Sequence, residues 1–363
     1  MSTLTRATVE AVLRRFTDPH LDQDPVSAGC VREVDIQGGR VSVRLELGYA
    51  AGLFKGGWAQ TLQMALENLD GVDDARVDVT CRIEAHKAQD QVPALAHVKN
   101  VIAVASGKGG VGKSTTAANL ALALAREGAR VGMLDADIYG PSQGIMFGLA
   151  EGTRPRVRDE KFFVPVEAHG VQVMSMAFLT DDDTPVVWRG PMVSGALIQL
   201  ITQTAWDDLD YLVIDMPPGT GDIHLTLAQK VPVSGAVIVT TPQDLALLDA
   251  RKGVEMFRKV NIPVLGVVEN MSVHICSNCG HAEHLFGEGG GEKLASRYGV
   301  DLLASLPLSM AIREQSDGGR PTTVADPESQ IAMLYQFMAR RVGARIAQGG
   351  QGTPMPTLVV SDD

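Results

Sequence analysis

The stretch VIAVASGKGGVGKSTT, residues 101–116, decides the fold class of this chain. A short β-branched run leads into a glycine-rich loop, and a helix-like stretch, residues 115–126, follows the loop. Residues 107–114 fit the pattern G-x-x-x-x-G-K-S/T, whose glycines let backbone N–H groups approach a phosphate without a Cβ atom in the way. A chance glycine-rich turn is the competing interpretation, and the strand before and helix after argue against it. The sequence therefore predicts a phosphate-binding loop.

Each side chain of this loop has an expected role. Lys113 is expected against the β- and γ-phosphates of ATP, and Ser114 is expected to hold Mg²⁺. Lys108 is a second lysine inside the loop, and its spacing alone fits a solvated charge. The residues predicted to contact the nucleotide are Gly107, Lys108, Gly109, Gly110, Val111, Gly112, Lys113, Ser114 and Thr115.

Short β-branched runs alternate with longer helical stretches from Asn100 onward. Continuous apolar runs of this kind are typical of strands buried on both faces. The alternation predicts an α/β fold, a P-loop NTPase with a mostly parallel, doubly wound sheet. The predicted strands are residues 101–106, 129–137, 171–176, 211–216, 236–241, 264–271 and 302–307.

Residues 1–88 follow another pattern and predict a small α+β domain in front of the P-loop domain. Apolar residues at helical spacing and an alternating hairpin around Gly38-Gly39 carry this prediction. Its expected helices and strands are residues 5–16, 31–36, 41–47, 58–69 and 75–83. Residues 89–97 lack periodicity and are expected to be a linker, the P-loop domain spans 98–343, and 344–363 are expected to be a flexible tail.

The composition limits the cellular setting. Lys and Arg total 32 against 43 Asp and Glu, a net charge of −11, which argues against broad binding to nucleic acid or anionic lipid. Four cysteines are too few for a disulfide scaffold, which favours a reducing compartment. The N-terminus lacks the apolar core of a signal peptide, and no apolar run reaches the length of a spanning helix. We expect a cytoplasmic protein that binds neither nucleic acid nor membrane.

Carboxylates follow two of the predicted strands. Asp135 and Asp137 close the strand 129–137, at the edge of the sheet where such folds bind ligands. Asp215 ends the strand 211–216, in the position of a carboxylate that orients Mg²⁺. A strand-end cap or a solvated turn is the competing interpretation for each aspartate, and it weighs more for Asp135 and Asp137.

Cys276 and Cys279 form C-S-N-C shortly after the strand 264–271. Two thiolates on one turn can ligate one ion or cluster, and without a second CxxC the pair is half of a four-thiolate site. Two facing chains could complete an iron–sulfur shell, a nearby histidine (274, 281 or 284) could complete a zinc site, or the pair could be a redox dithiol. Ligand counting favours the first. Cys30 and Cys81 are expected to be structural.

Several motifs together closely resemble the Mrp/ApbC family of P-loop ATPases, which carry a labile iron–sulfur cluster to apoproteins. The resemblance covers about residues 98–340, and the CxxC after VVENM separates this family from its MinD and ParA relatives. The front domain resembles the small domain fused to many bacterial members. The motifs are GKGGVGKST, LDADIYGPS, WRGPMV (188–193), IDMPPGTGD, VVENM, CSNCG and REQSDGGRP (313–321).

The resemblance implies roles for the nucleotide-site residues. Lys108 would reach the phosphates of the partner subunit, as in the deviant Walker A loop of MinD/ParA-like ATPases, and would act with Lys113 and Asp137 in catalysis. Asp137 would position the attacking water, and Asp135 and Asp215 would lie near the metal with Ser114. Asn270, otherwise an ordinary strand-end residue, would lie against adenine. Gly219–Asp222 would form a nucleotide-sensing switch.

The resemblance also implies partners and cofactors. The cofactors are ATP, Mg²⁺ and an iron–sulfur cluster, of the 4Fe–4S type, held by Cys276 and Cys279 of each chain of a homodimer. The recipients are apo iron–sulfur proteins. Many relatives carry a reactive cysteine after the second strand of the front domain, where this chain reads LELGYAAGLFKGG, without one.

Two rival functions stay open on the sequence. The first is a spatial-regulation ATPase of the MinD/ParA kind, and the second is a P-loop ATPase with a structural zinc site. The final residues offer no amphipathic helix for a membrane, and only short basic clusters such as Arg251-Lys252 could meet DNA.

Overall fold

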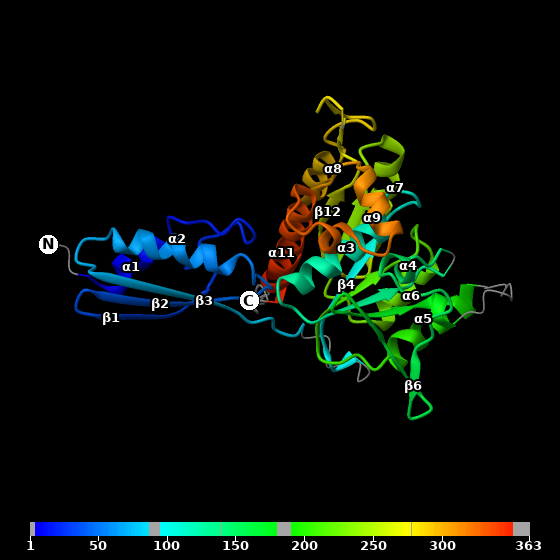
Figure 1. The fold of residues 1–363 in the computed structure, drawn as a ribbon, viewed down its shortest axis with the longest axis horizontal. Helices are drawn as coiled ribbons and strands as arrows, with labels where there is room; N and C mark the ends of the chain where they lie inside the picture. The colour runs from blue at the N-terminus through cyan, green and yellow to red at the C-terminus, as the bar shows by residue number, and fades with distance from the viewer. Residues whose placement is uncertain (1–3, 87–94, 139, 180–189, 277, 351–363) are drawn as a thin grey trace, which may run out of the picture.

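The computed structural model describes residues 4–86, 95–138, 140–179, 190–276 and 278–350. A small front domain projects from a larger α/β domain, and the long helix α11 (Gln330–Gly350) lies where the two meet (Figure 1). The chain therefore divides in space where its sequence pattern changes.

The front domain is a three-stranded sheet with two helices. Its elements are α1 (Arg6–Leu13), β1 (Val31–Gln37), β2 (Arg40–Leu47), α2 (Lys55–Glu67) and β3 (Asp74–Cys81). The strand order is β1-β2-β3, with β1 antiparallel and β3 parallel to β2. Alternate residues of β2, including Val43 and Leu45, are buried in the core of this domain because successive side chains of a strand point to opposite faces. The hairpin prediction is confirmed, while the first helix ends three residues earlier than expected.

The large domain contains an eight-stranded sheet in the order β15-β12-β11-β4-β10-β5-β9-β8. All neighbouring strands are parallel except β8, which pairs antiparallel with β9. The seven runs predicted as strands form β4 (Val98–Ala105), β5 (Val131–Asp135), β9 (Val171–Ser175), β10 (Leu209–Asp215), β11 (Gly235–Thr240), β12 (Val264–Glu269) and β15 (Leu302–Ser305). The short β8 (Val166–Ala168) was not predicted, since three residues carry too weak a periodic signal.

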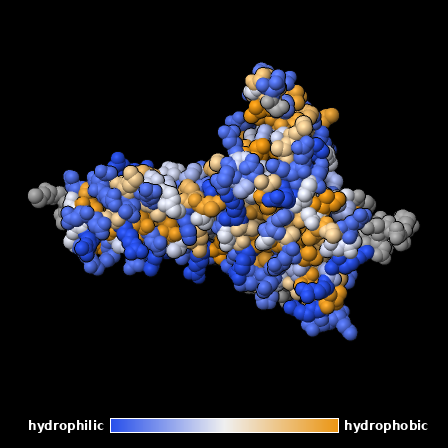
Figure 2. Space-filling model, in the orientation of Figure 1, coloured by the Kyte–Doolittle hydropathy of each residue, from blue (hydrophilic) through white to orange (hydrophobic). Residues whose placement is uncertain are grey.

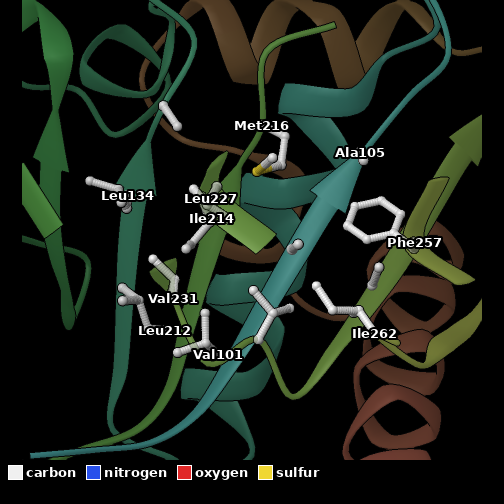
Figure 3. Close-up of a cluster of buried hydrophobic side chains, with 14 of the residues drawn as sticks. Val101, Ala105, Leu134, Leu212, Ile214, Met216, Leu227, Val231, Phe257 and Ile262 are labelled. Carbon is white, nitrogen blue, oxygen red and sulfur yellow. The ribbon is translucent and has the colours of Figure 1, made fainter. Parts of the chain in front are cut away.

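Helices cover both faces of this sheet, as the doubly wound prediction requires. Side chains of β4 alternate between two cores: Val101 and Ala105 face one, while Ile102 and Val104 face the other. The first core includes Leu227 and Phe257 from the covering helices, beside side chains of the central strands (Figure 3). The helices are α3 (Lys113–Arg126), α4 (Gln143–Met146), α5 (Gly190–Gln203), α6 (Asp222–Lys230), α7 (Asp244–Lys259), α8 (Gly290–Tyr298), α9 (Met310–Asp317) and α10 (Thr322–Ala325), with the 3₁₀ helix Met176–Leu179.

Two small hairpins complete the domain: β6 (Arg156–Arg158) with β7 (Phe162–Val164), and β13 (His274–Ile275) with β14 (Ala282–Glu283). The second hairpin carries the cysteine pair. In the described part of the chain, no helix has the length and apolar character that crossing a bilayer requires.

The expected flexible tail, residues 344–363, is wrong in its first part. Residues 344–350 continue α11, and Ala344 is fully buried among the core side chains of the front domain. The front domain covers this end of the helix. The glycine-rich sequence GGQG at residues 349–352 gives no sign of that contact. Residues 351–363 lie outside the described residues. So do residues 87–94, which include most of the expected linker 89–97. Leu95, in the described part of that linker, is fully buried.

Glu127, the residue after α3, joins the two domains. Its buried carboxylate accepts hydrogen bonds from Arg340 of α11, from Nε at 2.9 Å and Nη2 at 2.6 Å, and from the backbone N–H of Leu53 at 2.9 Å. The Glu127 carbonyl also accepts from the N–H of Gly52 at 3.0 Å, and a Cβ atom on Gly52 would lie 2.6 Å from that oxygen. The segment that contains Gly52 and Leu53 therefore docks the front domain on the large domain.

Arg340→Ala leaves the Glu127 carboxylate buried without its charged partner, and such a change costs about 3 kcal/mol of unfolding free energy. Urea unfolding should show this loss. Arg313→Ala is the matched control, because Arg313 forms exposed ion pairs with Glu314 and Asp317. Exposed ion pairs contribute about 0.5 kcal/mol to the free energy of unfolding. Equal losses in the two variants would contradict the role of Glu127 as a buried joint.

Candidate nucleotide site and cysteine hairpin

The glycine-rich loop connects β4 to α3 and is confined by its neighbours. Gly110 and Gly112 both have φ of +80°, a conformation that side chains with a Cβ rarely adopt. A Cβ atom on Gly112 would lie 2.1 Å from Nδ2 of Asn270, and one on Gly107 would lie 2.2 Å from the carbonyl carbon of Asp249. The loop thus needs glycine both for its backbone shape and for its packing.

Lys113, at the start of α3, is buried among carboxylates. Its ammonium donates to Oδ1 of Asp215 and to Oγ of Ser114 at 3.2 Å, and it lies 4.0 Å from Oδ2 of Asp137. Helix α3 begins here because the left-handed Gly112 precedes it. The structure therefore brings the predicted phosphate lysine, metal serine and strand-end aspartates to one place.

Asp135 lies beside Asp215, because β5 and β10 run parallel in register. Complete burial, with the charge of Asp215 as a lesser cause, raises the pKa of Asp135 to about 7. Its Oδ2 accepts hydrogen bonds from the N–H groups of Ser142 and Gln143 and from Oγ of Ser175. Asp135 thus also anchors the start of α4, a role that the LDAD string did not reveal.

The other predicted residues surround the same loop. Asp137 is buried, and its Oδ1 accepts from the N–H of Gly140 at 3.2 Å. Asn270 follows β12 and donates from Nδ2 to the carbonyl of Val111 at 2.9 Å, so its amide is a wall of the loop. Lys108 reaches Oε1 of Gln243 at 3.4 Å, just before α7. Gly219, in the expected switch, donates its N–H to the carbonyl of Ser106 at 2.9 Å.

Gln143, the first residue of α4, is a site residue that the sequence analysis missed. Its side chain is fully buried and donates from Nε2 to Oδ2 of Asp215 at 2.8 Å and to the carbonyl of Ser114 at 3.0 Å. A glutamine in a four-residue helix has no periodic signal, and only its position after LDADIYGPS could have pointed to it.

Cys276 and Cys279 lie in the turn between β13 and β14. The N–H of Cys276 donates to the carbonyl of His281, and the N–H of Gly280 donates to the carbonyl of Cys276, both at 2.9 Å. Cys279 is exposed and Cys276 is partly so. The backbone N–H groups of Cys279 and Asn278, which donate to the Cys276 sulfur, lower the pKa of that thiol.

Within one chain, the described residues do not complete a metal shell around this pair, since no group of three or more His, Cys, Asp or Glu side chains among them has an arrangement that could hold a metal ion. His274 and His284 instead contact backbone carbonyls, at 3.3 Å from Leu308 and 2.8 Å from Ser272. The zinc interpretation therefore gains no support from these residues.

The other two cysteines lie in the front domain, far along the chain from the hairpin. Cys30 belongs to the front-domain core, and burial raises its pKa to about 11. Burial also raises the pKa of the Cys81 thiol, which is partly exposed. Neither thiol has the ionised character of a metal ligand or nucleophile.

Two family models match separate parts of this chain. Residues 97–343 match the family model described as NUBPL iron-transfer P-loop NTPase, and residues 6–79 match the model described as iron-sulfur cluster assembly protein. The iron-sulfur cluster carrier protein of Pseudomonas fragi is 81% identical over 77% of this chain and 97% of its own length. That of Haemophilus influenzae is 48% identical over 96% of this chain and 94% of its own.

Solved structures share the fold of the large domain. A nucleotide-binding protein from Archaeoglobus fulgidus in complex with ADP is 41% identical, with a TM-score of 0.58 over 66% of this chain and 93% of that one. The cell division ATPase MinD from Pyrococcus furiosus, with a TM-score of 0.51 over 67% of this chain and 98% of that one, is 24% identical and shows the fold alone.

Thiol labelling of the native chain should separate the cysteines by pKa. The lowered pKa of Cys276 means that its thiolate is populated at lower pH than that of an ordinary thiol, whereas the raised pKa of Cys30 leaves it protonated at pH 7. Iodoacetamide at pH 7 followed by peptide mass spectrometry should find Cys276 modified well before Cys30. Labelling in urea is the control and should remove the difference. A native Cys30 that reacts as fast as Cys276 would contradict these pKa directions.

Proposed function

This chain belongs to the family of NUBPL iron-transfer P-loop NTPases, and on that premise we propose that it is an ATP-dependent carrier of iron–sulfur clusters. One observation carries the proposal: the few residues that follow β12 link the two sites directly. Asn270, just after β12, is a wall of the phosphate loop, and Cys276 follows it in the next hairpin. A shift of the loop on nucleotide binding can therefore reach the cysteines through a few residues of backbone.

The cysteine pair supports a cluster shared by two copies. A cubane cluster takes four thiolates, and each chain offers two on an exposed turn. A second copy related by a twofold axis supplies the other two. Such a cluster is labile, because separating the chains removes half of its ligands, and this lability suits transfer to an apoprotein.

Exposed apolar side chains near the hairpin suit such a homodimer. Ile275, next to Cys276, is 55% exposed, and Leu245, at the start of α7, is 72% exposed. Helix α8 follows the hairpin in the chain, and its first residue, Gly290, packs closely against the start of α7. A Cβ atom on Gly290 would lie 2.8 Å from the side chain of Leu247. Figure 2 shows hydrophobic side chains among polar ones on the part of the molecule that contains α7 and α8. Lys108 contacts Gln243, the residue just before α7. We assign Lys108 to the phosphates of the partner subunit.

The nucleotide site fits Mg²⁺, because the hydroxyl of Ser114 and the carboxylates of Asp215 and Asp135 are the hard oxygen ligands that this ion prefers. When bound with ATP, the ion neutralises phosphate charge. Lys113 then has to leave Asp215 for the β- and γ-phosphates. We assign Asp137 to orienting the attacking water, and Asn270 to the adenine ring. ATP hydrolysis is thereby coupled to the geometry of the dimer that holds the cluster.

Cys276→Ala and Cys279→Ala should each lose the cluster while ATP binding persists, because the hairpin is separate from the phosphate loop. Anaerobic reconstitution, iron and acid-labile sulfide analysis and a visible spectrum give the readout; the unaltered chain should hold about two iron and two sulfide per chain. Cys81→Ala is the matched control and should keep the cluster. A full cluster in either hairpin variant rejects the shared-cluster proposal, and bound zinc in place of iron rejects the carrier function.

Lys113→Ala should abolish ATP binding and hydrolysis, because the phosphates lose their main counter-charge.

Lys108→Ala should keep ATP binding and lose ATP-dependent dimerisation, which sedimentation velocity with and without ATP measures. Lys252→Ala, on the exposed side of α7, is the control for charge and should behave as the unaltered chain. ATP-dependent dimers that persist without Lys108 would count against its role across the interface.

A further inference from the structure

Gln143 connects the phosphate loop to the strand-end aspartates. Both hydrogens of its side-chain amide are engaged, one by Oδ2 of Asp215 at 2.8 Å and one by the Ser114 carbonyl at 3.0 Å. Both partners are acceptors, so the amide nitrogen must face them and the orientation of the amide is settled. The amide therefore holds two residues that belong to different elements, α3 and β10.

The backbone of Gln143 is itself held firmly. Its N–H donates to Oδ2 of Asp135 at 3.0 Å, and the N–H of Ser142 donates to the same oxygen at 2.9 Å. Asp135 lies beside Asp215 on the neighbouring strand. One aspartate thus fixes where the glutamine begins, and the other receives the end of its side chain.

The two oxygens of Asp215 are divided between two donors. Oδ1 accepts from the ammonium of Lys113, and Oδ2 accepts from Gln143. A nucleotide draws Lys113 toward its phosphates, and Oδ1 then loses its partner. Gln143 keeps its hold on Oδ2, because the glutamine is anchored through Asp135 rather than through Lys113.

The side-chain oxygen of Gln143 lies at the other end of the same amide group. Oε1 of Gln143 is buried and has no hydrogen-bond partner among the described residues. Buried acceptors are nearly always paired in the functional state of a protein. A water molecule brought in with the nucleotide and its metal is a donor that would satisfy this oxygen.

We propose that Gln143 is a positioning residue for the metal–nucleotide complex: it keeps Asp215 and Ser114 in place after Lys113 has turned to the phosphates. The inference rests on the proposed ATP-dependent function and adds a residue to its site. Gln143 touches neither the phosphates nor the reacting water in this account. It acts through Asp215 and Ser114, so its effect should appear in the magnesium requirement rather than in the affinity for nucleotide alone.

The test uses Gln143→Met in the full chain, because methionine keeps the length and volume of glutamine and removes both donors. Fluorescent ATP-analogue titrations are made with excess EDTA and at increasing Mg²⁺, beside the Mg²⁺ dependence of ATP hydrolysis. Loss of a hydrogen bond to a charged group predicts a rise of about tenfold in the half-saturating Mg²⁺ concentration. Binding in EDTA should stay within about twofold of the unaltered chain, because the phosphate loop is intact.

Gln143→Glu is the second variant. It replaces both amide donors with a carboxylate that faces Asp215 and the Ser114 carbonyl, and it should likewise change the Mg²⁺ dependence more than the affinity for nucleotide in EDTA. Gln199→Met, on the exposed side of α5, is the matched control and should leave every value unchanged. Should the acidic variant not fold, the methionine variant decides alone.

Two results would overturn the inference. An unchanged Mg²⁺ requirement in Gln143→Met shows that Asp215 needs no help from the amide. An equal loss of binding with and without Mg²⁺, together with a lower melting temperature, shows a purely structural role. A chain with native Gln143 that binds no nucleotide would instead reject the proposed function, so the two failures are distinct.

Discussion

The attraction between one buried ammonium and the carboxylates around it organises this structure. Lys113 is held by Asp215 at the carboxyl edge of the sheet, with Asp137 close by. Burying these charges is tolerable because they neutralise one another and because backbone and side-chain donors satisfy the remaining oxygens. In the proposed function, the phosphates of the nucleotide replace Asp215 as the anionic partner of Lys113.

Helix α3 connects the lysine at the phosphate loop with the contact between the two domains. The helix starts at Lys113, beside the phosphate loop, and Glu127 after its last residue binds both α11 and the front domain. On the opposite side of the loop, the segment that follows β12 runs from Asn270 to the cysteine hairpin. The loop therefore lies between two connections, one toward the front domain and one toward the cysteine hairpin.

The front domain contacts the large domain through polar groups of its backbone. Gly52 and Leu53 donate their backbone N–H groups to Glu127. Its own cysteines are poor thiolates, because burial raises the pKa of both. Arg341 and Arg345 of α11 add ion pairs to Asp22 of the front domain and to Asp301 of the large domain. The contact is polar as well as apolar, which sets the orientation of the domain.

Local signals in the sequence were enough for the seven parallel strands of the large sheet and for the glycine-rich loop. Strand runs buried on both faces and glycines at fixed spacing depend on neighbours in the chain, and so they can be predicted from it. The contacts that only the folded chain makes could not be predicted. Gln143 reaches Asp215 because β5 places Asp135, its backbone anchor, beside that residue, and the end of α11 buries Ala344 among the core side chains of the front domain. The physical reason is the same in both cases. Each depends on a partner tens or hundreds of residues away, and no periodicity or motif records a contact that forms only when the chain folds.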